Sequence, residues 1–200
     1  MPNGQTLQFA TLPARQPNVG AALLNAHVPA AVIRLSLDPT RLPAGTMDRE
    51  VTVEWVRKPG RDLPATLHRE ISWEGLPNLA EDCVTFPLTW NDTDLTELGA
   101  IAVMALLVHE LEGGVIDRVL PIGSGGDYLI TTPGSRAPGQ VEVSGVTEDG
   151  DSRETRKRVK KKADQVLTHA RAGFVSVTAF SHPPAGGVRS FLHFVRRPRK

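Results

Sequence analysis

Two acidic residues in the second half of the chain, Asp127 and Glu142, have the type and placement of ligands for a divalent cation. Asp127 follows the glycine-rich stretch 123–126 and opens a strand-like segment, and Glu142 lies inside the next one. Mg²⁺ prefers oxygen ligands at about 2.0–2.1 Å, so its ligands must converge, and adjacent strands can bring two acids side by side. Because side chains alternate along a strand, Glu142 is expected on the face opposite Val141 and Val143. The sequence therefore predicts half of a cation site.

Helical and strand patterns alternate around these two acids. Capping residues at 91–94 precede a segment that is apolar nearly all round and that Gly113-Gly114 ends, which predicts a buried helix over residues 94–112. A second helix, basic and amphipathic, begins at a capping box in residues 151–154 and ends at Gly173. The strand patterns lie at residues 115–122, 127–132, 140–146, 174–180 and 188–195.

The first half of the chain shows no catalytic pattern. Residues 1–29 hold four prolines among polar residues and are expected to form an irregular arm. Residues 30–91 are expected to form an antiparallel β unit, and residues 92–200 an α/β domain with a basic tail. The strands expected in the β unit are 31–37, 50–56 and 83–90, separated by loops at 38–39, 43–45, 58–60 and 76–78.

The order helix, three strands, helix, strand, with an acid opening the second strand and Glu on the third, resembles the PD-(D/E)xK nuclease superfamily. The resemblance covers roughly residues 94–195. It implies an α+β chain with a restriction-endonuclease-like core, α-β-β-β-α-β and one further strand, preceded by the N-terminal antiparallel β unit. It also implies that Asp127 and Glu142 bind Mg²⁺ and that Glu97, on the first helix, joins the site.

The superfamily has a lysine two residues after the glutamate, where it positions or activates the attacking water, but this chain has Ser144 there. Some members supply the lysine from the following helix, which in this chain offers several. Helical projection places Lys160 and Lys162 beside the apolar face of that helix and Lys161 nearly opposite it. Lys162, with Gln165 three residues on, resembles the lysine and glutamine of several branches. The resemblance thus favours Lys162 as the catalytic lysine, while Ser144 also fits a degenerate site.

Basic residues are concentrated in the second helix, although the net charge is only +1. Seven of the ten residues 153–162 are Arg or Lys, and the chain ends in a second basic run. Such a helix can neutralise phosphates and release their counterions, or it can simply be a solvated face. The residues expected to contact nucleic acid are Arg156, Lys157, Lys160 and Lys161.

The sequence leaves two functions open. The first is a metal-dependent nuclease-like protein that acts on nucleic-acid phosphodiesters with Mg²⁺ as its cofactor. The alternative is a catalytically inactive module with a nuclease fold that binds protein or nucleic acid. In the first case the N-terminal β unit would bind a protein partner or the substrate, and in the second a protein partner would bind through the β unit or the proline-containing arm.

Cysteine content and hydropathy predict a cytoplasmic protein. The single cysteine, Cys83, excludes an internal disulfide, and the N-terminus lacks the pattern of a signal peptide. The longest apolar run, residues 98–108, has eleven residues, whereas a bilayer-spanning helix needs about 20. No membrane partner is expected.

Overall fold

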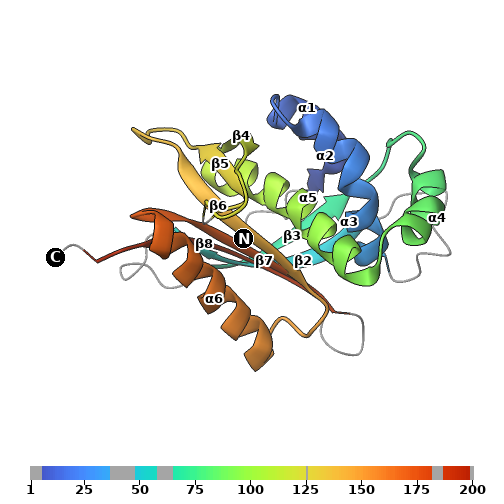
Figure 1. Ribbon diagram of the computed structural model, residues 1–200. Helices are drawn as coiled ribbons and strands as arrows, with labels where there is room; N and C mark the ends of the chain where they lie inside the picture. Colours follow the sequence, from blue (N-terminus) through green and yellow to red (C-terminus); the bar gives the residue numbers. More distant parts are fainter. Residues whose placement is uncertain (1–5, 37–47, 58–64, 125, 182–186, 199–200) are drawn as a thin grey trace.

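A single eight-stranded mixed sheet organises the chain (Figure 1). The computed structural model describes residues 6–36, 48–57, 65–124, 126–181 and 187–198. The strands lie in the order β1-β3-β2-β8-β7-β6-β5-β4. Several helices cover one face of the sheet, and α6 (Arg153–His169) covers part of the other. The mixed α/β class predicted from the sequence is confirmed.

The second half of the chain has the predicted order of elements. β4, β5 and β6 form an antiparallel meander, and α6 then crosses over so that β7 lies parallel to β6. β8 returns antiparallel to β7. These elements are α5 (Asp92–Glu112), β4 (Val115–Val119), β5 (Tyr128–Thr131), β6 (Gly139–Val146), α6, β7 (Ala172–Phe180) and β8 (Val188–Arg196).

Helix α5 is apolar nearly all round because it is covered on two sides. It packs against β6 and β7 on one side and against α3 (Val28–Leu35) on the other. The Asn91 side chain caps its first turn by accepting a hydrogen bond from the Asp94 N–H at 3.0 Å. Gly113 ends it in the left-handed conformation, with φ of 61°. No helix in the described ranges has the length and apolar composition to cross a membrane.

Helix α6 is amphipathic, as predicted, because only one of its faces meets the sheet. Ser152 caps it by accepting a hydrogen bond from the Thr155 N–H. Val166 is completely buried against Val175, Val177 and Phe191 of β7 and β8. The charged residues of the helix remain toward solvent or, in two cases described below, reach acids on the sheet.

The prediction of an irregular arm over residues 1–29 is wrong, and so is the strand predicted at residues 31–37. The chain instead forms β1 (Thr6–Gln8), a 3-10 turn, α1 (Leu12–Arg15), α2 (Gly20–Ala26) and α3. Pro13 and Pro29 lie in the first turns of α1 and α3, where proline is well tolerated because its missing N–H has no helical partner. Seven of the eight residues of α3 are buried, and so short an apolar run is as typical of a buried strand as of a helix.

The strand predicted at residues 83–90 is also wrong, because this segment belongs to helix α4 (Leu79–Thr89). Its alternating apolar residues do not mark a buried face: Cys83 is buried, but Val84 and Leu88 are exposed. Glu81 and Asp82 lie in the first turn, where acidic side chains favour the helix dipole.

The N-terminal strands extend the same sheet. The predicted strand at 50–56 is confirmed as β2 (Asp48–Val56), and it pairs antiparallel with β3 (Ala65–Ser72), which the sequence did not predict. β3 has few apolar residues because much of it is exposed. β2 also pairs parallel with β8 and so joins the hairpin to the second half of the chain. The loops expected at 38–39, 43–45 and 58–60 lie outside the described residues.

One buried polar side chain ties the N-terminal helices to α5 and β4. Gln16 is completely buried between α1 and α2. Its Nε2 donates to the carbonyls of Ala105 at 3.0 Å and Gly114 at 3.2 Å, and its Oε1 accepts from the Ile116 N–H at 2.7 Å. The Gln16 side chain therefore forms hydrogen bonds with three backbone groups near the junction between α5 and β4.

We predict that Gln16→Ala lowers the free energy of unfolding by about 2–4 kcal/mol, because it takes away the buried partner of the Gly114 carbonyl and the Ile116 N–H. Urea denaturation followed by circular dichroism measures the change. Gln8→Ala, at an exposed position of β1, serves as the control and is expected to change stability little. Equal midpoints for the two variants would contradict the prediction.

Candidate functional site

The candidate site lies along the open edge of β6. β5 pairs with β6 only as far as Tyr128 opposite Val141, with one further bond from the Asp127 N–H to the Val141 carbonyl at 2.9 Å. Beyond Val141, the N–H groups on this edge belong to Val143 and Gly145. They face acidic side chains instead of another strand.

Asp127 is held at this edge by the backbone of β6. Its Oδ2 accepts a hydrogen bond from the Val143 N–H at 2.7 Å. The residue directly precedes β5, as predicted, and its own carbonyl accepts from the Leu120 N–H across the hairpin at 2.8 Å. The carboxylate is therefore fixed in position while its other oxygen, Oδ1, accepts no hydrogen bond from the described residues.

Glu142 is buried and forms an ion pair with Lys162. Val141 and Val143 pack in the core cluster that contains α5, while Glu142 contacts α6 on the opposite face, as the alternation predicted. Glu142 Oε1 accepts a hydrogen bond from Lys162 Nζ at 2.8 Å, with side chains only 7% and 16% exposed. Of the lysines considered from the sequence, Lys162 is the one whose ammonium reaches the predicted acid. Its chemical role stays a prediction.

Glu97, the acid expected from the first helix, binds the next part of β6. Its Oε2 accepts from the Gly145 N–H at 2.9 Å and its Oε1 from the Ser144 hydroxyl at 3.1 Å. Glycine is required at 145, because a Cβ there would lie 2.1 Å from the Thr96 carbonyl oxygen. Both oxygens of Glu97 are thus engaged, and this residue lines a separate pocket of about 210 Å³.

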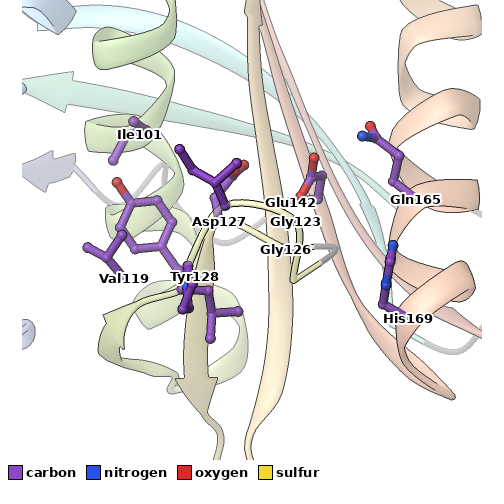
Figure 2. A pocket seen from close by; sticks show the side chains of 12 residues that line it. Ile101, Val119, Gly123, Gly126, Asp127, Tyr128, Glu142, Gln165 and His169 are labelled. Carbon is purple, nitrogen blue, oxygen red and sulfur yellow. The ribbon is translucent and has the colours of Figure 1, made fainter.

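Asp127 and Glu142 line the same pocket, which has a volume of about 410 Å³. Figure 2 shows Glu142 between Asp127 and two side chains of α6, Gln165 and His169. The apolar part of the lining comes from α5, the end of β4, the β4–β5 loop and β5, and includes Ile101, Val119, Leu120 and Tyr128. The pocket therefore reaches around the free edge of β6, from α5 on one face of the sheet to α6 on the other, and both acids line it.

The buried phenol of Tyr128 closes one side of this pocket. Burial, together with the negative charge of Asp127, raises the pKa of Tyr128 to about 12. The phenol therefore stays neutral at physiological pH and can donate a hydrogen bond without adding charge beside the two acids.

The donor set fits Mg²⁺ only in part. No group of three or more His, Cys, Asp or Glu residues able to hold a metal occurs among the described residues. Mg²⁺ sites that act on phosphates nevertheless use one or two carboxylates and take the remaining ligands from water and substrate. Asp127 and Glu142, each with one oxygen engaged, would suit that role, whereas Glu97 is fully occupied.

Two of the four basic residues expected to contact nucleic acid are paired within the protein. Arg156 donates to both carboxylate oxygens of Glu54 at 3.0 and 3.2 Å, and Lys157 pairs with Glu154 at 2.6 Å. Lys160 and Lys161 are exposed. Contact with nucleic acid therefore stays a prediction. Of the four residues, Lys160 and Lys161 are the two best placed to make it.

Two pocket residues on α6, Gln165 and His169, could have been predicted from their spacing in the sequence. They lie three and seven residues after Lys162, a spacing that places all three on one face of α6. Once Lys162 is matched to Glu142, this spacing also predicts His169 as a residue of the site, which the sequence analysis did not include. His193 lies elsewhere, 3.1 Å from Glu54, and His182 is outside the described residues.

Comparison of the chain with protein-family models, with curated proteins and with solved structures found no match. A function for this protein therefore has to be argued from the geometry of its own residues.

Buried histidines give a testable pH dependence. Burial lowers the pKa of His193, with Arg156 adding to the effect and Glu54 opposing it, and burial also lowers the pKa of His27. The unfolded chain then binds more protons than the folded one once the pH falls below the ordinary histidine value of 6.5. Stability should be fully present above pH 6.5 and decline as the pH falls further.

We predict that the urea midpoint of the wild-type protein falls between pH 7 and pH 5.5 and that the double variant His27→Gln/His193→Gln shows a smaller fall. Both proteins are to be compared at each pH by circular dichroism. An equal slope in the two would mean that these histidines are not the groups responsible.

Proposed function

We propose that this protein is a metal-dependent nuclease-like protein that acts on nucleic-acid phosphodiesters. The observation that carries the proposal is the convergence of Asp127 and Glu142, from neighbouring strand segments, on one pocket, with Lys162 Nζ 2.8 Å from Glu142. Two carboxylates that line one pocket, with a lysine paired to one of them, are groups that can hold a divalent metal and stabilise a phosphate that is being attacked.

The arrangement of elements supports the same proposal. After residue 92 the order is helix, three strands, helix and strand, with the meander β4-β5-β6 joined to parallel β7 through α6. This is the order that the resemblance to the restriction-endonuclease-like fold implies. A fold alone does not define an activity, so the order of elements supports the proposal only in combination with the positions of Asp127 and Glu142.

Each residue has a separate task in the proposed reaction. Asp127 and Glu142 would hold Mg²⁺, which when bound lowers the pKa of a water molecule and offsets phosphate charge. The Val143 N–H fixes Asp127, so its free oxygen is already oriented. Lys162 balances the charge of Glu142, and its ammonium can donate to the attacking water or to a phosphate oxygen. Glu97 is a positioning residue that holds Ser144 and Gly145.

A second candidate, the catalytically inactive binding module, is favoured by two specific observations. Ser144 stands in place of the usual lysine, and its hydroxyl donates a hydrogen bond to one carboxylate oxygen of Glu97. The other oxygen of Glu97 accepts a hydrogen bond from the Gly145 N–H. The described residues also contain no three-ligand cluster for a metal. In this case the protein would bind nucleic acid or a protein partner without cleaving a phosphodiester.

We predict that the wild-type protein cleaves labelled DNA or RNA in Mg²⁺ and that Asp127→Asn lowers the rate at least about 100-fold, because it removes a metal-binding charge. Asparagine keeps an oxygen that can accept from Val143, so the fold should be retained. Gel electrophoresis measures cleavage, and circular dichroism checks the fold.

Lys162→Met should have an effect of similar size, whereas Arg136→Met, which removes an exposed cation outside both α6 and the pocket, should change the rate little. Removing Lys162 leaves Glu142 buried without its partner, so the melting temperature of each variant must be compared at the same time. Cleavage that persists in folded Asp127→Asn, or a wild-type protein without metal-dependent cleavage, would favour the binding module.

A further inference from the structure

Residues 119–122, at the end of β4 and the start of the loop that follows it, expose apolar side chains directly beside the two acids. Val119 is 63% exposed and Ile122 is fully exposed, and both line the pocket that contains Asp127 and Glu142. Pro121, also exposed, lies between them. Exposed aliphatic side chains gathered at a pocket mark a surface that meets a ligand more often than single scattered ones do.

Hydrogen bonds hold this loop in place, so the exposure of Ile122 is part of the folded structure. The Leu120 N–H donates to the Asp127 carbonyl at 2.8 Å, and the Ser124 N–H donates to the Pro121 carbonyl at 3.1 Å. From β6, Gln140 Nε2 donates to the Ser124 carbonyl at 3.4 Å. The apolar tip is therefore carried on a turn that is tied to the strands bearing the acids.

The pocket has one apolar wall and one polar wall. Its apolar lining includes Val119, Leu120, Ile122 and the ring of Tyr128, and its polar lining is Asp127, Glu142, Gln165 and His169. Figure 2 shows Val119 and Tyr128 across the pocket from Gln165 and His169. Its volume of about 410 Å³ lies near the lower end of the range of about 300–1,000 Å³ for small-ligand sites. This is room for one nucleotide unit and too little for a stacked base pair.

We propose that this pocket takes a single unpaired base of a nucleic-acid strand, with the Val119–Ile122 loop against the face of the base. The proposal rests on the proposed function, because it places the phosphate of the same nucleotide at Asp127 and Glu142. Gln165 and His169 face the base or sugar from the polar wall and supply hydrogen-bonding groups. The preferred substrate is then a strand with unpaired bases and not an intact duplex.

The physical reason is the mismatch between this pocket and a duplex. A base inside a duplex has both faces covered by its neighbours, and taking it out costs a few kcal/mol, whereas an unpaired base offers its face freely. Contacts with the face of a base carry little sequence preference, because every base has a π-face. The pocket should therefore select for unpaired structure and tolerate any sequence.

The test measures binding without cleavage, with Ca²⁺ replacing Mg²⁺ in fluorescence anisotropy titrations. Three labelled ligands are compared: a short single strand, the blunt duplex of the same sequence, and the single strand with abasic sites. The variant is Ile122→Ser, and the matched control is Leu88→Ser, an equally aliphatic residue that is 84% exposed on α4, a helix that does not line the pocket.

We expect the wild-type protein to bind the single strand about tenfold more tightly than the duplex, and Ile122→Ser to lose about fivefold on the single strand. Its affinity for the duplex and the abasic strand should stay unchanged, and Leu88→Ser should match the wild type throughout. Equal binding of all three ligands, an Ile122→Ser variant that matches Leu88→Ser, or no binding of any ligand would overturn the proposal. So would a free nucleoside monophosphate that binds as tightly as the strand.

The outcome separates this inference from the proposed cleavage. A selective loss in Ile122→Ser together with no cleavage by the wild-type protein would support the base pocket and refute the nuclease. Cleavage that depends on Asp127, without any preference for unpaired bases, would support the nuclease and refute the base pocket.

Discussion

Backbone N–H groups on the edge of a strand need hydrogen-bond acceptors. The acceptors of the N–H groups on the free edge of β6 are side-chain carboxylates, and these hydrogen bonds position the acids of the candidate site. β5 stops pairing at Val141, and the next two N–H groups on this edge belong to Val143 and Gly145. Two carboxylates, from Asp127 and Glu97, accept these hydrogen bonds at 2.7 and 2.9 Å. Since charged acceptors form stronger hydrogen bonds than neutral ones, the strand edge fixes both acids firmly. Glu142 lies on β6 between Val141 and Val143, the two residues whose backbone groups bind Asp127.

Two ion pairs fix α6 over the other face of the sheet, and they determine which of its cations remain available. Lys162 pairs with buried Glu142, and Arg156 pairs with Glu54, which is also buried. Removing one partner of such a pair is costly, because the remaining charge stays in a poorly solvated place. The helix thereby has a defined rotation that turns Gln165 and His169 toward the pocket and leaves Lys160 and Lys161 exposed. Stability and the proposed chemistry thus depend on the same contacts.

Whether an element was predicted correctly from the sequence depended on how it is buried. Helix α6 meets the sheet with one face and carries a clear periodicity, and α5 was recognisable from its capping residues and its terminal glycine pair, so both were predicted. Helix α3 is buried all round, and α4 leaves apolar residues exposed, so neither has a pattern that separates helix from strand. β3 was missed because its partners, β1 and β2, leave much of its side-chain surface in solvent.

The sequence by itself determined the local features of the site: an acid before β5, an acid inside β6 and a lysine on the inward side of α6. These follow from turn residues and from the alternation of side chains, which act over a few residues. Only the tertiary structure decided that Asp127 and Glu142 share a pocket, that Glu97 binds Ser144 and Gly145 instead, and that Arg156 pairs with Glu54. The register of the sheet and the rotation of each helix set these contacts, and both depend on packing between segments far apart in the chain.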